Sequence, residues 1–221
     1  TSALRFEDAA NAIAIFQMQA FTKTNSPFDR FLHRDDNAMT TEQKRGGVLF
    51  FGRAQCGSCH SGPFLGGQTF TNAGVPQIGP GGAKQRPLDL GRGELIQQNA
   101  DAYRFAFRVA PLRNVELTAP YMHNGAYASL EAVIEHYNDV PKALRNYDAS
   151  QLAPAVRALY HGEPATIDAV LATLDFRLRT PLNLTEAEKR ELLAFLKALT
   201  DPAARDLSGV APARVPSGLN P

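Results

Sequence analysis

Apolar residues recur at the three- and four-residue spacing of amphipathic helices in several parts of the chain. Two such stretches open the sequence, residues 3–20 and residues 40–51, and the second begins with a capping box formed by Thr40 and Gln43. Near the other end, a capping box that begins at Thr185 precedes the clearest apolar stripe. The stripe follows helical spacing at Leu192, Phe195, Leu196 and Leu199. The pattern therefore predicts a mainly α-helical fold.

Shorter helices and a long loop are expected between these stretches. We predict helices from Ser129 to about Tyr137, over residues 149–160 and over residues 164–178. Residues 61–93 are rich in glycine and proline, which predicts a long irregular loop, and ordered loops of this length usually have a function. No stretch shows the alternation typical of a strand, and no internal repeat stands out.

The pattern divides the 221 residues into three parts. We expect residues 1–40 to form a helix and linker that pack on the main domain, residues 41–200 to form that domain, and residues 201–221 to form a Pro-rich tail. A hydrophobic content of 44% is enough to bury a real core, and a net charge of +1 argues against nucleic-acid binding. No apolar run approaches the roughly 18 residues of a membrane span. Because no secretory leader precedes the first helix, we expect a removed leader or a longer parent chain.

The only two cysteines lie in one short segment, Cys56-Gly57-Ser58-Cys59-His60. A disulfide framework would spread its cysteines along the chain, and a structural zinc site would need four ligands. A redox Cys-x-x-Cys beside a bystander histidine is the alternative, but the residues before it do not predict the strand that such a site follows. A c-type haem uses all three side chains, since each thiol adds to a vinyl group and His60 binds the iron. We therefore predict a cytochrome c-like domain with one covalent haem c.

The ligand on the other face of the iron decides the chemistry, because two firm protein ligands favour electron transfer and an open site binds small molecules. The downstream candidates are Met122, His123, His136, Tyr137 and His161. A thioether from Met122 would raise the potential, whereas a phenolate from Tyr137 would lower it. Methionine is the usual partner in a small cytochrome c, which favours Met122, but spacing alone leaves both residues open.

The stretch from Pro111 to Tyr137 resembles the bacterial di-haem cytochrome c peroxidase and MauG family. Shorter segments that also match are Asn25–Arg30, Leu65–Gly67, Asn72–Pro76 and Asp89–Arg92. The resemblance covers nearly everything from about residue 10 to residue 200, and it implies the C-terminal, electron-transfer haem domain of a two-haem protein. The chain departs from the family because it lacks the first Cys-x-x-Cys-His. The peroxide-reactive haem is therefore expected outside this chain.

The resemblance also implies site residues. Alignment on residues 128–131 places Tyr137 at the distal-ligand position of the family, so Tyr137 becomes the expected ligand and Met122 the alternative. His123 and Asn124 are then expected to fix the turn next to the haem. A calcium ion lies between the two haems of the family, and the matching ligands here are the backbone carbonyls of Thr118 and Pro120, with the others outside the chain.

These features predict the electron-transfer haem domain of a peroxidase or MauG-like oxidase, which relays electrons between the peroxide-reactive haem and a donor protein or substrate. The alternative is a mono-haem electron carrier without enzymatic activity, which the single Cys-x-x-Cys-His supports. The guanidinium geometry of Arg113 suits a haem propionate, although a solvated surface charge is an equal alternative. Thioether attachment takes place outside the bacterial cytoplasmic membrane, which predicts a periplasmic protein.

Overall fold

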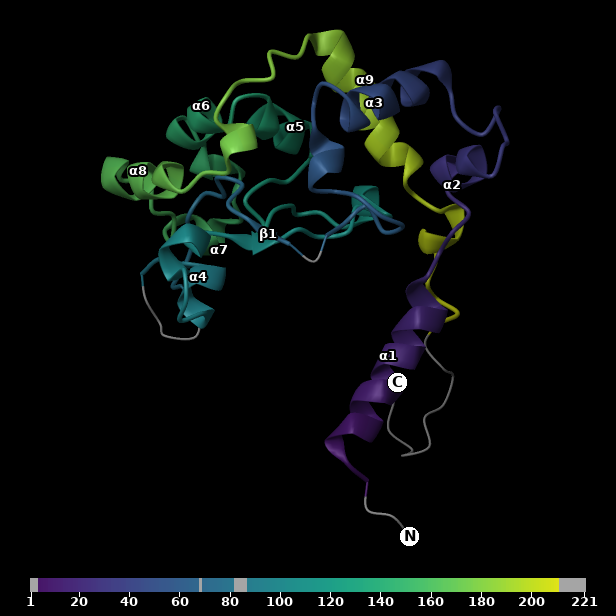
Figure 1. Ribbon diagram of the computed structural model, residues 1–221, viewed down its shortest axis with the longest axis horizontal. Helices are drawn as coiled ribbons and strands as arrows, with labels where there is room; N and C mark the ends of the chain where they lie inside the picture. Colours follow the sequence, from purple (N-terminus) through teal and green to yellow (C-terminus); the bar gives the residue numbers. More distant parts are fainter. Residues whose placement is uncertain (1–3, 68, 82–86, 211–221) are drawn as a thin grey trace.

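The computed structural model describes residues 4–67, 69–81 and 87–210, and these are mainly helical with long irregular connections (Figure 1). The helices in chain order are α1 (Phe6–Phe21), α2 (Pro27–Leu32), α3 (Thr41–Phe51), α4 (Arg92–Leu95), α5 (Leu130–Asn138), α6 (Val140–Arg145), α7 (Pro154–Arg157), α8 (Pro164–Ala172) and α9 (Glu186–Ala198). The strands β1 (Phe70–Thr71) and β2 (Phe107–Arg108) pair antiparallel. The predicted helical fold class is confirmed.

The main core forms where α3 packs against α9, two helices that lie side by side in Figure 1. Phe195 of α9 is fully buried, and the rings of Phe28, Phe50 and Phe51 surround it with centroid distances of 5.3, 5.1 and 6.0 Å. The backbones approach closely at Gly46, where a Cβ atom would lie 1.9 Å from the carbonyl oxygen of Glu191. Only glycine fits this contact, because any side chain there would collide with the backbone of α9.

A second core packs α6 and α8 against the loop that contains β2. Its buried side chains are Phe105, Leu144, Ile167 and Val170. Helix α5 connects the two cores in the fold, since Leu130 and Ile134 on one of its faces belong to the main core while α6 follows directly after it. One face of α5 therefore packs into the main core, and its other side chains meet different neighbours.

The two N-terminal helices differ in how they pack. Helix α2 packs on the main domain through Phe28. Helix α1 instead has no buried residue and projects away from the other helices in Figure 1. The apolar side chains of α1 are therefore not buried by the other residues that the structure describes. Of the predicted tail, residues 211–221 lie outside the described residues.

Three local features differ from the sequence prediction. Ser26 and Asp29 form a capping box that starts α2, where the pattern indicated only the end of the first helix. The helix predicted over residues 149–160 is a 3-10 turn followed by the single-turn α7, and the helix predicted over residues 164–178 is shorter, because α8 ends at Ala172.

None of the helices in the described parts of the chain combines the length and apolar character that a membrane crossing requires.

Candidate functional site

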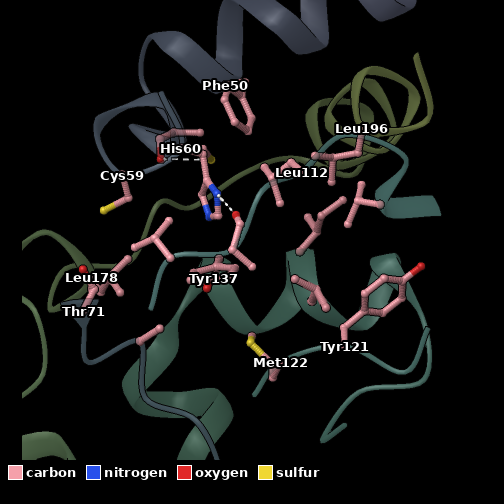
Figure 2. Close-up of a pocket in the computed structure, with 18 of the residues that line it drawn as sticks. Phe50, Cys59, His60, Thr71, Leu112, Tyr121, Met122, Tyr137, Leu178 and Leu196 are labelled. Carbon is pink, nitrogen blue, oxygen red and sulfur yellow. Dashed lines mark hydrogen bonds between the residues drawn. The ribbon is translucent and has the colours of Figure 1, made fainter. Parts of the chain in front are cut away.

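A cavity of about 480 Å³ lies at the centre of the main domain, between α5 and the pair α3 and α9 (Figure 2). Its walls are largely apolar, with Phe50 from α3, Leu196 from α9 and Ile134 from α5 among them. Strand residues Thr71 and Phe107 also line it. This volume lies within the roughly 300–1,000 Å³ typical of cofactor sites, and apolar walls suit a flat hydrophobic group.

Cys56, Cys59 and His60 all line this cavity. Helix α3 ends just before them, Gln55 takes a left-handed conformation with φ 55°, and the 3-10 turn η1 (Cys56–Ser58) follows. The backbone N–H of His60 then donates to the carbonyl oxygen of Cys56 at 2.9 Å, which closes the segment into a compact turn. This turn presents the two thiols and the imidazole to the same space.

The two thiols are free, and the surroundings of Cys56 do not resemble a redox centre. Burial raises the pKa of the Cys56 thiol to about 12. Redox-active cysteines instead have lowered pKa values and sit near positive groups. The structure therefore weakens the alternative of a redox Cys-x-x-Cys with a bystander histidine, and the thiols suit attachment to a cofactor in the cavity.

The hydrogen bonds of His60 leave one of its ring nitrogens free to bind a metal. Its Nδ1 lies 3.1 Å from the carbonyl oxygen of Leu65 and 3.1 Å from that of Ala110, so Nδ1 carries the proton and Nε2 has a free lone pair. Burial lowers the pKa of His60, although the two carbonyl groups oppose this effect, and the ring is neutral. Gly66 permits the arrangement, since a Cβ atom there would lie 2.5 Å from the backbone of Pro111.

Tyr137 and Met122 face the same cavity. Figure 2 shows His60 entering from one side and both of these side chains entering from the other. Tyr137 projects from α5, its hydroxyl makes no hydrogen bond with any described residue, and burial raises its pKa. Met122 lies in a turn with φ 69°, between two residues that form a β-bridge. The structure thus brings together both ligands that the sequence left as alternatives.

Of the three histidines considered as ligands, only His123 lines the cavity, and its ring already has other partners. His123 stacks on Phe107 with a centroid distance of 3.9 Å, and its Nε2 lies 3.1 Å from a carboxylate oxygen of Asp89. The Asn124 side chain donates to the carbonyl oxygen of Pro76 at 2.7 Å. These contacts hold the turn beside the cavity, the role expected for His123 and Asn124. His136 and His161 do not line the cavity.

Comparisons with known proteins support a haem site in this cavity, although no family model matches the chain. MauG of Methylorubrum extorquens is 33% identical over 194 residues, which cover 87% of this chain and 44% of that protein. Cytochrome-c peroxidase IdrP1 of Denitromonas iodatirespirans is 33% identical over 226 residues, with coverage of 91% and 52%. A solved MauG-like protein associated with microbial copper homeostasis has a TM-score of 0.63 and 29% identity, and the match covers 100% of this chain and 58% of that one.

The chain matches the bacterial di-haem peroxidase and MauG family. These relatives are haem-dependent oxidoreductases, and they support a haem and an electron-transfer role here. The chain spans about half the length of the curated relatives that it matches. The residues of the cavity fit a covalent haem, because two thiols, a free imidazole nitrogen and an opposing oxygen or sulfur donor meet within apolar walls.

The contacts of Arg113 differ from both alternatives that its sequence position left open. It does not line the cavity. Its Nη1 and Nη2 donate to the two carboxylate oxygens of Asp29 at 2.8 and 2.7 Å, and its Nε donates to the carbonyl oxygen of Pro63 at 2.6 Å. The guanidinium group therefore connects α2 to the loop after the haem motif, and it is neither a propionate partner nor a solvated charge.

Two other arginines line the cavity, and the sequence did not single them out. Arg108 of β2 is exposed, and its guanidinium group forms no hydrogen bond or ion pair with any described residue. Arg177 pairs with Asp175 and lies 3.3 Å from the hydroxyl of Ser58, next to Cys59. Neither residue belongs to a motif, so only the pairing of β1 with β2 and the return of the chain after α8 reveal them.

The residues expected to bind calcium remain a prediction. Thr118 and Pro120 are exposed and lie at the edge of the cavity. Within residues 4–67, 69–81 and 87–210, no group of three or more His, Cys, Asp and Glu side chains is arranged to hold a metal ion. A calcium ion at these carbonyl groups would need further oxygen ligands from outside the chain.

Proposed function

We propose that this chain is the electron-transfer haem c domain of a di-haem peroxidase or MauG-like oxidase. It relays electrons between a peroxide-reactive haem outside the chain and a donor protein or substrate. The observation that carries the proposal is the cavity with a protein donor on each side, His60 on one and Tyr137 or Met122 on the other. A site closed by two protein ligands favours electron transfer over peroxide binding.

Three residues of the cavity would hold the cofactor, each in a different way. Cys56 and Cys59 attach it through thioethers, and the Nε2 atom of His60 binds the iron while the carbonyl groups of Leu65 and Ala110 keep the proton on Nδ1. A covalent haem supplies an iron centre that accepts and releases single electrons. The apolar walls exclude water, so little solvent reorganises when the charge of the centre changes.

We propose Tyr137 as the distal ligand, with Met122 as the alternative. Tyr137 sits on the rigid helix α5, and its hydroxyl is left without a hydrogen bond to any described residue. Without a metal, burial keeps the phenol protonated, but a bound ferric ion favours the phenolate because its charge is opposite. Tyrosine ligation lowers the potential, which suits a centre that shares oxidising equivalents with a second haem.

Other parts of the site are assigned in the same proposal. Arg108 and Arg177 hold the haem propionates, since guanidinium groups match carboxylates in geometry and charge. Calcium bound by the carbonyls of Thr118 and Pro120 would join this domain to the one that carries the reactive haem. The similarity to this family and the thioether chemistry support a periplasmic location.

The ratio of haem to polypeptide in the full-length gene product tests the main proposal. Two haems per polypeptide and peroxide-dependent oxidation of a donor are the expected results. One haem and no peroxide-dependent oxidation would instead establish the mono-haem carrier, which the single Cys-x-x-Cys-His of this chain favours.

The ferric absorption and EPR spectra of single variants test the ligand. Tyr137→Phe is expected to change the six-coordinate signature, and Met122→Leu to leave it unchanged. Tyr121→Phe is a matched control, because Tyr121 also lines the cavity but its hydroxyl contacts the carbonyl oxygen of Glu116. The assignment fails if the spectrum responds to Met122→Leu and not to Tyr137→Phe.

A further inference from the structure

A continuous row of aromatic rings leads away from the cavity at Tyr137. The next ring is that of His136, with a centroid distance of 5.3 Å, and Tyr127 follows His136 at 5.2 Å. Tyr147 follows Tyr127 at 5.5 Å, and Tyr160 follows Tyr147 at 5.1 Å. These five residues, here called the tyrosine row, connect the haem cavity to the partly exposed Tyr160.

In the middle of the row, the buried phenol of Tyr127 is hydrogen-bonded to the imidazole of His136, which can accept its proton. Tyr127 is 5% exposed and His136 is 1% exposed. The His136 Nε2 lies 2.8 Å from the carbonyl oxygen of Ala73, which can only accept, so Nε2 carries the proton and Nδ1 is an acceptor. The Tyr127 hydroxyl therefore donates to Nδ1 of His136, at 2.8 Å. A tyrosine can lose an electron readily only if its proton leaves at the same time, and this hydrogen bond gives the proton a destination.

The composition concentrates this chemistry in the row. The chain has no tryptophan and six tyrosines, and four of the six belong to the row. Tryptophan and tyrosine are the aromatic side chains that are oxidised most easily. With tryptophan absent, an oxidising equivalent that leaves the haem through aromatic residues must pass to tyrosine.

We propose that the tyrosine row carries single oxidising equivalents from the haem site to the surface at Tyr160. This rests on the proposed function, because the oxidant is the haem of this chain after it has passed an electron to the peroxide-reactive haem. Tyr127 gives one electron through His136 and Tyr137 to the oxidised haem, its O–H bond breaks, and the proton moves to Nδ1 of His136. Tyr127 is then a neutral radical, and the haem is reduced by one electron.

The equivalent leaves the protein at Tyr160. Tyr160 gives one electron through the Tyr147 ring to Tyr127, which takes its proton back from His136, while Tyr160 releases its own proton to water. The net change is the oxidation of Tyr160 by one electron and the reduction of the haem by one electron. The radical on Tyr160 is then available to a hydrogen-atom donor at that surface, such as a phenol or a thiol, which restores Tyr160 with one electron and one proton.

Flash photolysis of the haem-loaded protein with ruthenium tris(bipyridine) and a cobalt(III) quencher tests the route without peroxide. The ruthenium(III) oxidant generates the oxidised haem, whose lifetime is read by transient absorption and whose radical product is read by EPR after freezing. In the wild type we expect a tyrosyl radical. Tyr127→Phe should lengthen the lifetime of the oxidised haem at least several-fold, and Tyr103→Phe should not change it. Tyr103 is a matched control because it is 38% exposed and outside the row.

Tyr160→Phe is a second variant, at a partly exposed site where folding is not at risk. It should keep the radical on Tyr127 and abolish spin-trap labelling of the peptide that contains residue 160, as measured by mass spectrometry. Equal lifetimes in the wild type and Tyr127→Phe, or labelling of residue 160 that persists in Tyr127→Phe, would overturn the route. A full-length gene product that shows the photochemical responses but no peroxide-dependent oxidation of a donor would refute the proposed function and support the row.

Discussion

Replacing Asp29 by asparagine removes the charge that Arg113 pairs with. The side chain of Asp29 is 6% exposed and that of Arg113 is 17% exposed, and two hydrogen bonds of 2.8 and 2.7 Å join them. Breaking a buried ion pair costs about 3–5 kcal/mol, because the remaining charge stays away from water. The asparagine oxygen keeps one acceptor and Arg113 is slightly exposed, so we expect a loss of about 3 kcal/mol in the free energy of unfolding. For a domain of this size that lowers Tm by about 6–12 °C.

The effect should depend on pH in a defined direction. Burial alone would raise the pKa of Asp29, but hydrogen bonds from Arg113 and Ser26 outweigh it, and the net pKa is below its usual value. A lowered pKa in the folded state stabilises the protein above the unfolded value of about 3.9 and loses that contribution as pH falls through the folded value. The difference between wild type and Asp29→Asn should therefore be full at pH 7 and should shrink below about pH 4.

Urea unfolding of the haem-loaded protein, followed by far-ultraviolet circular dichroism across this pH range, measures the difference. Asp8→Asn is the matched control, since Asp8 occupies the same capping-box position in α1 but its side chain is 44% exposed. We expect this control to change stability by about 0.5 kcal/mol or less. If Asp29→Asn costs no more than Asp8→Asn, or if its cost is the same at pH 7 and pH 3, the ion pair does not stabilise the fold.

Two further predictions concern helix packing and haem attachment. Gly46→Ala should destabilise the protein by about 2 kcal/mol or more in thermal unfolding, because the clash with Glu191 exceeds the gain of about 1 kcal/mol in helix propensity. Gly209→Ala is the control and should be nearly neutral, because a Cβ atom at Gly209 would lie in open space. Equal stability of the two variants would contradict the tight contact at Gly46. Replacing both Cys56 and Cys59 by alanine should leave a haem that acidified butanone extracts and that intact-protein mass spectrometry no longer detects, and retention of the haem mass would refute thioether attachment.

Some features of this protein could be read from the residues because they are local. A capping box is formed by neighbouring residues, so Thr40 and Thr185 predicted the starts of α3 and α9. The stripe from Leu192 to Leu199 predicted which face of α9 is buried. The spacing of Cys56, Cys59 and His60 likewise indicated a haem attachment segment, because these three side chains are close neighbours along the chain.

Other features depend on contacts between residues that are distant in the sequence. The sequence assigned Arg113 to a propionate or to solvent, yet it binds Asp29, which lies 84 positions earlier. Arg108 and Arg177 reach the cavity only because the chain folds back through β2 and through the segment after α8. The exposure of α1 among the described residues was equally unpredictable, since an apolar helix indicates that it needs a partner surface but not which segment supplies it.

For this protein, the sequence determined the helical class, and it predicted the haem attachment segment and, through the family resemblance, Tyr137 as the distal ligand with Met122 as the alternative. The tertiary structure decided which side chains share the cavity and which are engaged elsewhere, including the row from Tyr137 to Tyr160. The physical reason is that helix periodicity and capping act within a few residues, whereas hydrogen bonds, ion pairs and ring contacts depend on how distant segments pack.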